Sequence, residues 1–409
     1  MTRFWHPFAD IAVLQERGEL LLDRGEGVYV YDESGRRYLD STAGLWFCNA
    51  GWGRSEIADA AAEQMRKLPA YHTYGDLATR PVTELAERIA ALFPVEGSYV
   101  FFGSAGGEAI ESAFKLARRY WTLNGEEQRT VVIARERAYH GLNGFGTALA
   151  GAEAWREGIG PLTPDVDRVP WDSADALRET IERYGAERVA AFFCEPVIGA
   201  GGVLPPPEGY LAEVRSICRE TGVLFVADEV ITGFGRCGAW FASGRFDLDP
   251  DLVTFAKGVT SGYLPLGGVI ASPRVVEAFR ERGAMFRQGY TYSGHATVAA
   301  AALANLDILE RERIPDHALE LETQLTEALA PLAGHALVSE VRSGTGVLAA
   351  VQLADPTQLD RVVLAAREAG VLTRGLLGGA LQISPPLVIE RAQLDELAAG
   401  LGSALDSVA

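Results

Sequence analysis

Between residues 98 and 270, short apolar runs alternate with amphipathic stretches. Runs in which polar residues do not alternate with apolar ones are typical of strands buried on both faces, as in parallel sheets. The amphipathic stretches, such as Glu108–Trp121 and Gly209–Glu220, have the spacing of helices that connect such strands. This alternation predicts an α/β core built on a largely parallel sheet. The expected strands are Tyr99–Phe102, Thr130–Ala134, Val189–Cys194, Val223–Ala227 and Leu252–Phe255.

Different patterns flank this core. Residues 26–40 indicate a hairpin, because Tyr29 and Tyr31 fall on one face of the first strand and residues 32–35 have the composition of a turn. After Ala296, an alanine-rich helix extends to about Arg311. The remaining chain predicts a smaller α+β domain, with helices at 316–331, at 357–369 and from Glu390, and strands at Val347–Gln352 and 380–383.

The length of 409 residues is sufficient for two domains, and 48% apolar with 22% charged residues is a globular composition. We expect residues 1–45 to form an N-terminal segment that packs with the small domain. Residues 46–295 should form the large domain and residues 296–409 the small C-terminal domain. No repeat, low-complexity tract or long linker interrupts the sequence, so these parts should pack tightly.

Charge and cysteine content narrow the class of protein. A net charge of −18 argues against nucleic acid or an anionic membrane as a partner. The four cysteines show no CxxC spacing and no histidine-rich neighbourhood, so neither a disulfide framework nor a metal site is expected. The N-terminus does not resemble a signal peptide and no apolar run reaches membrane-spanning length, so we expect a soluble, cytoplasmic protein.

Each of the five expected strands is followed by residues that could bind a ligand. In open α/β sheets, ligands bind beyond the carboxyl ends of the strands. Together the five sets therefore predict one site at one edge of the sheet. They are Gly103-Ser-Ala-Gly-Gly107, Tyr139-His-Gly141, Glu195-Pro196, Asp228-Glu229 and Lys257-Gly258.

Asp228 and Lys257 point to a specific chemistry. A lysine amine forms a Schiff base with an aldehyde cofactor, and a carboxylate keeps a pyridinium nitrogen protonated. This pairing suggests pyridoxal phosphate. Each residue also has an ordinary interpretation, since Asp228 could cap the next helix and Lys257 could be a surface lysine. However, Lys257 lies in a stretch otherwise without charge, and a buried Asp228 needs a charged partner.

The other three sets fit the same cofactor or a plainer role. The glycines of residues 103–107 could let backbone N–H groups and a helix N-terminus bind a phosphate, or could form an ordinary strand-to-helix turn. Tyr139 could stack on a flat heteroaromatic ring, and His140 could be an ordinary hydrogen-bonded loop histidine. Glu195 could simply close its strand, or could lie near the phenolic oxygen of the ring.

Over nearly its whole length, the sequence resembles the class III pyridoxal-phosphate aminotransferases of fold type I. The block Asp228–Arg236 begins 29 residues before Lys257 (257 minus 228) and is highly specific. Within the family, the resemblance is closest to the omega-amino acid:pyruvate aminotransferases. The other matching blocks are Phe101–Ala109, Tyr139–Gly141, Glu195-Pro196, Ala256–Gly258 and Thr291–His295, and the subgroup cues are Asp40–Trp46, Leu68–Tyr74 and Arg374 ahead of Ser384–Leu387.

The resemblance implies how this chain binds pyridoxal 5'-phosphate. Lys257 would hold it as a Schiff base and then carry the transferred proton, and Asp228 would pair with the pyridine nitrogen. The other implied contacts are Tyr139 and Val230 on the two ring faces, His140 and Glu195 beside the ring, Gly106 and Gly107 on the phosphate, and Thr291 on the phosphate of the other subunit.

The resemblance also implies a homodimer with active sites at the subunit interface, and a substrate pocket. Trp46 and Tyr74 would line this pocket. Arg374 would bind a substrate carboxylate bidentately, a task suited to a guanidinium group.

The implied reaction is the ping-pong transfer of an amino group from an amine or omega-amino acid to an α-keto acid, with pyruvate as the expected acceptor. An aminomutase or amino acid racemase would share Lys257 and Asp228, so the sequence leaves that alternative open; only a transaminase requires a keto acid. The intact lysine and aspartate argue against a non-catalytic protein. A nucleotide-dependent dehydrogenase is excluded, because it would need a suitable glycine-rich turn near the N-terminus and this sequence has none there.

The sequence departs from the family in three respects. Gly107 stands where serine is common, so one hydroxyl donor to the phosphate is missing. Ala296 stands where, in the family, a proline often follows a Gly-His or Gly-Asn pair. The chain is also shorter than typical pyruvate-dependent members, in the connections of the small domain on which substrate choice depends.

Overall fold

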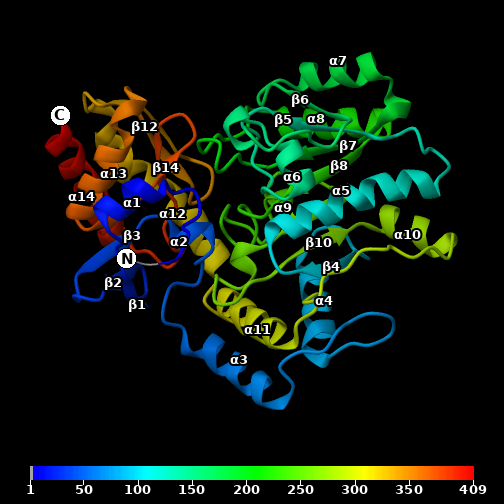
Figure 1. Ribbon diagram of the computed structural model, residues 1–409, viewed down its shortest axis with the longest axis horizontal. Helices are drawn as coiled ribbons and strands as arrows, with labels where there is room; N and C mark the ends of the chain where they lie inside the picture. Colours follow the sequence, from blue (N-terminus) through cyan, green and yellow to red (C-terminus); the bar gives the residue numbers. More distant parts are fainter. Residues whose placement is uncertain (1–2) are drawn as a thin grey trace.

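The computed structural model describes residues 3–409, and a seven-stranded sheet forms the centre of its larger part (Figure 1). The strand order is β4-β10-β9-β8-β7-β5-β6. Only β10 runs antiparallel to its neighbours in this sheet, so the prediction of a largely parallel sheet is confirmed. The strands are β4 (Tyr99–Gly103), β5 (Val131–Arg135), β6 (Val166–Val169), β7 (Val189–Cys194), β8 (Leu224–Asp228), β9 (Leu252–Phe255) and β10 (Gly267–Ala271).

Helices cover both faces of this sheet, which explains the unbroken apolar runs. In β5, Val131 and Ile133 pack into one buried cluster while Val132 and Ala134 pack into another. Successive side chains of a strand point to opposite faces, so both sets of alternate positions must be apolar. The first cluster includes α7 (Ala174–Tyr184) and α8 (Tyr210–Thr221), and the second includes α5 (Gly106–Leu123), α6 (Gly144–Leu149) and α10 (Pro273–Glu281).

The chain ends form a second region, where N-terminal and C-terminal elements lie side by side (Figure 1). In its first sheet, β3 pairs in parallel with β13, so the N-terminal strands share a sheet with the C-terminal part. This first sheet contains β1 (Leu22–Glu26), β2 (Tyr29–Asp32), β3 (Arg37–Asp40) and β13 (Val371–Leu372). A second sheet contains β11 (Val338–Arg342), β12 (Ala349–Leu353), β15 (Ala380–Ile383) and β14 (Gly375–Leu376), in that order. The helices are α1 (Ile11–Arg17), α12 (Ile314–Leu329), α13 (Leu359–Glu368) and α14 (Arg391–Val408).

Between the two regions, α11 (Ala296–Arg311) packs against α3 (Ser55–Lys67) and α4 (Arg80–Leu92). The expected elements of the C-terminal part are present, with boundaries that differ by at most two residues. The expected domain limits, at residues 45 and 295, stay a prediction.

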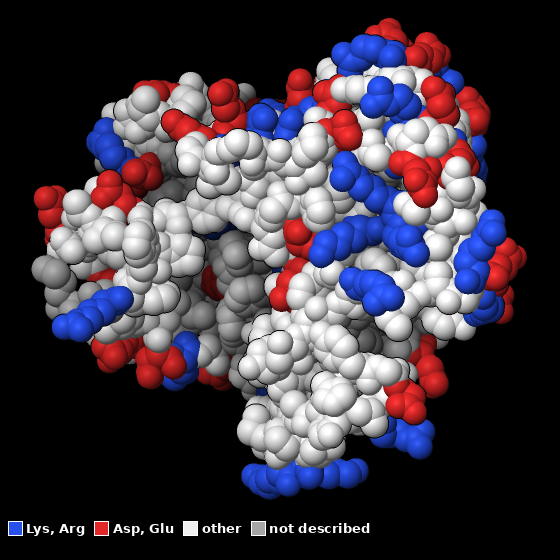
Figure 2. Space-filling model, turned by 45° about the vertical axis from the view of Figure 1, so that its right-hand side comes forward, with Lys and Arg blue, Asp and Glu red and all other residues white. Residues whose placement is uncertain are grey.

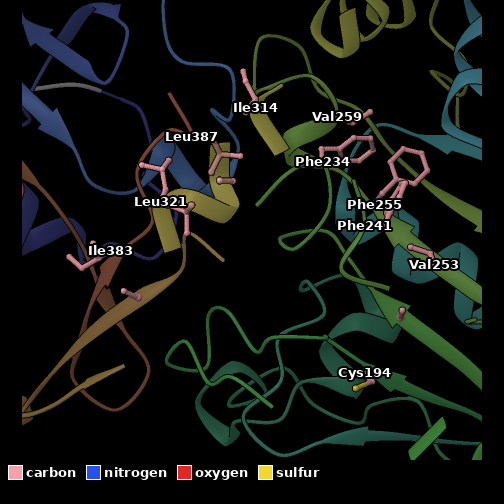
Figure 3. Close-up of a cluster of buried hydrophobic side chains, with 14 of the residues drawn as sticks. Cys194, Phe234, Phe241, Val253, Phe255, Val259, Ile314, Leu321, Ile383 and Leu387 are labelled. Atoms are coloured by element: carbon pink, nitrogen blue, oxygen red, sulfur yellow. The ribbon is translucent and has the colours of Figure 1, made fainter. Parts of the chain in front are cut away.

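One buried cluster crosses from the large sheet to the C-terminal region (Figure 3). Phe234, Phe241 and Phe255 meet edge to face or tilted on the sheet side, with ring centroids 5.2 to 5.9 Å apart. Ile314, Leu321 and Leu387 belong to the same cluster on the other side. Because this core is continuous, the two regions should hold a fixed relative position.

Arg236 strengthens this junction with hydrogen bonds. Its fully buried guanidinium donates to the carbonyl oxygens of Pro385 at 2.7 Å and Val347 at 3.3 Å, and to Oδ1 of Asn49 at 2.7 Å. Burial lowers the pKa of Arg236 to about 10. One side chain of the Asp228–Arg236 block thus ties the large sheet to residues near both ends of the chain.

The surface carries charges of both signs. On the face shown in Figure 2, acidic and basic side chains are interspersed, so the net charge of −18 does not collect into one acidic patch there. Within residues 3–409, no helix combines the length and apolarity that a membrane span requires.

We predict that Arg236→Met lowers the free energy of unfolding by about 3 kcal/mol, because it leaves three buried acceptors without a donor. Urea unfolding of the purified protein measures this difference. Arg282→Met is the matched control, since the Arg282 side chain is exposed and forms no hydrogen bond with residues 3–409; it should change stability by less than about 0.5 kcal/mol. Equal effects of the two substitutions would contradict the role given to Arg236.

Candidate active site

A cavity of about 180 Å³ opens at the carboxyl ends of the parallel strands. The five sets of residues that follow the strands each contribute to its lining, as expected from the sequence. Eight of the predicted site residues line it, namely Gly106, Gly107, Tyr139, His140, Glu195, Asp228, Val230 and Lys257; the others are Leu45, Ile110, Gly141, Ile231 and Ala256.

Asp228 is the last residue of β8 and is 4% exposed. Its Oδ1 accepts hydrogen bonds from the Thr254 hydroxyl at 2.8 Å and from the Val230 N–H at 3.1 Å. Its Oδ2 lies 2.7 Å from His140 Nδ1. Asp228 does not cap the next helix, because the neighbouring Glu229 accepts the first N–H groups of α9 (Ala242–Arg245).

Lys257 follows β9, the strand next to β8, and its backbone has a φ of +48°. A non-glycine residue rarely adopts this left-handed conformation, so the surrounding structure must hold it there. Burial is the main cause that lowers the pKa of Lys257 to about 8; the charge of Arg374 acts in the same direction, while Asp228 and Glu195 act in the opposite one. About a tenth of the amine is therefore neutral, and so nucleophilic, at pH 7, far more than for an ordinary lysine.

The glycine-rich turn leads into the N-terminus of α5. The N-cap residue is Ala105, which has no side-chain acceptor for the first N–H groups of the helix. A Cβ on Gly106 would lie 2.8 Å from Cγ1 of Val230, so only glycine fits there. A Cβ on Gly107 would lie 3.3 Å from the amide nitrogen of Asn143, so a serine at this position would crowd that side chain.

Glu195 and Tyr139 are held together on one side of the cavity. The Glu195 carboxylate accepts the N–H groups of Tyr139 and Gly199, both at 3.0 Å. Burial raises the pKa of Glu195. The Tyr139 ring packs edge-on against Trp155, with ring centroids 5.0 Å apart. His140 Nε2 is buried and has no hydrogen-bond partner among the described residues.

Arg374 and Trp46 lie beside this cavity but are not part of its lining. The Arg374 guanidinium stacks on the Trp46 ring at 4.6 Å. Its charge acts on both Lys257 and Tyr139, so it lies close to the cavity. Trp46 is 3% exposed and packs in a buried cluster, and it is the neighbouring Leu45 that faces the cavity.

Tyr74 and Thr291 lie together on the surface, away from the lining of the cavity. Tyr74 is 53% exposed, and its hydroxyl would be 2.9 Å from a Cβ on Gly289. The neighbouring Thr73 donates to the carbonyl oxygen of Ser293 at 2.9 Å. Within one chain, these two predicted residues are therefore brought together with each other but not with Lys257.

Sequence reasoning missed Thr254 and Leu45. Thr254 is paired with Asp228 across β8 and β9, three residues before Lys257. The only available signal was a polar residue in an otherwise apolar strand. Leu45 was inside a block that resembles the family, but nothing in the sequence distinguished it from Trp46.

Pyridoxal phosphate fits these residues on three observations. The uncapped N-terminus of α5 offers N–H groups to a phosphate. The buried Asp228 carboxylate can meet a protonated ring nitrogen. The amine of Lys257 is partly neutral and borders the same cavity. Such a fold and site define a pyridoxal-phosphate-dependent transferase.

Comparison with known proteins gives the family. The model of the class-III aminotransferases matches residues 12–405, so the chain belongs to this family of pyridoxal-phosphate-dependent enzymes. A putrescine–pyruvate aminotransferase of Pseudomonas aeruginosa PAO1 is 40% identical, over 98% of this chain and 94% of its own. A β-alanine–pyruvate aminotransferase of the same strain is 36% identical, over 99% and 96%.

A solved structure agrees with these relatives. An amine transaminase of an uncultivated Pseudomonas species, in a pyridoxal-phosphate-bound form, is 36% identical and has a TM-score of 0.95. The similarity covers 100% of this chain and 99% of that one. The chain is thus an aminotransferase, and both the fold class and the cofactor expected from the sequence are confirmed.

We predict that apoprotein captures pyridoxal phosphate faster as the pH rises, with a midpoint near pH 8, because only the neutral Lys257 amine reacts. Stopped-flow absorbance between pH 6 and pH 10 measures this rate. Arg374→Met should move the midpoint upward, since the charge of Arg374 lowers the pKa of Lys257. A midpoint at the value of an ordinary lysine would contradict this account.

Proposed function

We propose that this enzyme transfers the amino group of amines and omega-amino acids to an α-keto acid, with pyruvate as acceptor. The proposal rests on one observation, the unpaired guanidinium group of Arg374 beside the cavity. Among residues 3–409 its side chain makes no ion pair, and its one side-chain hydrogen bond is from Nε to Gln382 at 2.6 Å. A half-buried guanidinium with free Nη groups suits a substrate carboxylate. The pyruvate-dependent relatives described above support the choice of acceptor.

In the proposed mechanism, pyridoxal phosphate supplies an aldehyde that takes up the amino group and a ring that withdraws electrons. Lys257 Nζ would accept a proton from the substrate carbon that bears nitrogen and would donate one to the aldehyde carbon of the cofactor in the same half-reaction. In the second half-reaction it would move a proton in the opposite direction. Asp228 keeps a negative charge beside the ring nitrogen, so that this nitrogen stays protonated. Tyr139 and Val230 would pack on the ring faces, while His140 and Glu195 position Asp228 and Tyr139.

The N–H groups of Gly106 and Gly107 bind the phosphate through the positive end of α5. Arg374 then binds the carboxylate of an omega-amino acid or of pyruvate, beside Trp46. Donor and acceptor use the same pocket in turn, so the kinetics should be ping-pong.

We predict that Arg374→Met raises the KM for pyruvate by about 10- to 100-fold, the loss expected for hydrogen bonds to a charged group. The KM of an amine without a carboxylate, such as 1-phenylethylamine, should change less than about twofold, because that amine gains nothing from the guanidinium. Steady-state kinetics with both substrates measures the difference. A pyruvate KM that stays at the wild-type value would exclude Arg374 as the carboxylate-binding residue.

We further propose that the enzyme is a homodimer in which Tyr74 and Thr291 complete the site of the partner. Both are exposed and belong to segments that contact each other, yet lie outside the lining of their own chain's cavity. An exposed aromatic ring is common at interfaces between subunits. Thr291 would offer its hydroxyl to the phosphate in the partner's site, compensating for the absence of a serine at Gly107.

Hybrid dimers test this arrangement. Lys257→Ala and Thr291→Glu are each expected to be inactive, but mixed dimers would contain one site with both native residues. Unfolding and refolding the two variants together should then restore about a quarter of wild-type activity, because half of the dimers are hybrid. The control mixture, Lys257→Ala with Asp228→Asn, should restore none, because both changes affect residues of one chain's site. Absence of activity in the first mixture would contradict a shared site.

A further inference from the structure

Gln382 lies in β15, is fully buried, and contacts both Arg374 and the turn that leads to Trp46. Its Oε1 accepts the Arg374 Nε–H at 2.6 Å. Its Nε2 donates to Ser384 Oγ at 2.7 Å and to the Thr42 carbonyl oxygen at 3.4 Å. All three contacts are with neutral or cationic groups, and among residues 3–409 the Arg374 guanidinium forms no ion pair.

These contacts fix the orientation of the amide. Arginine has only donors, so the oxygen of Gln382 must face Arg374. The nitrogen then faces the Thr42 carbonyl, where it has an acceptor. A flipped amide would set donor against donor at Arg374 and lone pair against lone pair at Thr42. The buried side chain thus has one favourable orientation.

The Thr42 carbonyl connects Gln382 to the turn that carries Trp46. This carbonyl also accepts the backbone N–H of Trp46 at 2.8 Å. The turn is strained, because Ala43 and Trp46 both have positive φ values, of +47° and +60°. Gln382 therefore holds Arg374 directly and the Trp46 turn through one shared carbonyl.

Holding Nε directs the rest of the guanidinium. A planar guanidinium has two edges that can bind a carboxylate bidentately, one formed by Nε with an Nη and one by the two Nη groups. Gln382 occupies Nε, and the Trp46 ring covers one face at 4.6 Å. The edge formed by Nη1 and Nη2 remains available, and rotation about the guanidinium is restricted.

We propose that Gln382 is a positioning residue that sets the preference of this enzyme for substrates with a carboxylate. It fixes the Nη edge of Arg374 toward the pocket and does so as a neutral acceptor, leaving the positive charge for the substrate. This inference rests on the proposed role of Arg374. A carboxylate at position 382 would form an ion pair with Arg374 and compete with the substrate.

The test compares Gln382→Met and Gln382→Glu with wild type in two half-reactions, followed by stopped-flow absorbance. β-Alanine is the donor with a carboxylate and 1-phenylethylamine the donor without one. Gln382→Met should raise the half-saturation concentration for β-alanine about 10-fold, the effect of losing one bond to a charged group. Gln382→Glu should raise it about 100-fold, because it also neutralises Arg374. Both should keep the 1-phenylethylamine half-reaction within about twofold of wild type.

Gln352→Glu is the matched control on the neighbouring strand β12. Gln352 likewise accepts from an arginine, Arg342 Nη2 at 3.1 Å, and donates to the carbonyl oxygen of Gly378 at 2.7 Å. This site is outside the cavity, so the substitution should leave both half-reactions at wild-type values.

Two results would overturn the proposal. In the first, the Gln382 variants weaken both donors equally, which would mean general disruption of the site. In the second, they weaken neither donor although Arg374→Met weakens β-alanine, which would mean that Arg374 needs no positioning. A third result, in which Arg374→Met leaves the half-saturation concentration for β-alanine unchanged, would contradict the proposed function of Arg374 together with this inference. The three results differ from one another, so the two failures can be told apart.

Discussion

Asp228 brings a carboxylate into the interior at the end of β8, where a charge is costly unless several groups stabilise it. Thr254, Val230 and His140 supply three contacts; Val230 follows Asp228 by two residues, while Thr254 and His140 come from segments that the sheet brings together. In the proposed site, a protonated ring nitrogen would provide the positive charge that these residues leave open. The position of the cofactor, and hence of every other proposed contact, would follow from this one carboxylate.

The fold supports Asp228 through strand register. The register of β8 and β9 sets Asp228 opposite Thr254, and the chain reaches Lys257 three residues later. β4 has the same direction as these strands, so the turn into α5 opens at the same edge. A lysine, a carboxylate and a helix N-terminus from distant parts of the sequence thus border one small cavity. The strained backbone at Lys257 is held between the buried strand β9 and Asn305, whose Nδ2 donates to the carbonyl oxygens of Gly258 and Val259.

The sequence predicted the parallel strands well, because burial on both faces leaves an unmistakable apolar run. It missed β6, whose Val-Asp-Arg-Val pattern is short and polar, and β10, whose two glycines weaken the strand signal. Eight of the predicted site residues face one cavity, because they follow strands that end at one edge. Thr254 and Gln382 escaped prediction, since their importance comes from a partner on another strand or loop. Tyr74 and Thr291 show a further limit: one chain does not bring them to its own Lys257.

Nitrogen-15 NMR of the enzyme loaded with ring-labelled pyridoxal phosphate tests the central claim most directly. The account predicts a protonated ring nitrogen in the wild type throughout the neutral pH range, and loss of that proton in Asp228→Asn. Thr254→Val, which removes one bond to the carboxylate, should give an intermediate response. A ring nitrogen that is unprotonated in the wild type, or equally protonated in Asp228→Asn, would contradict the account.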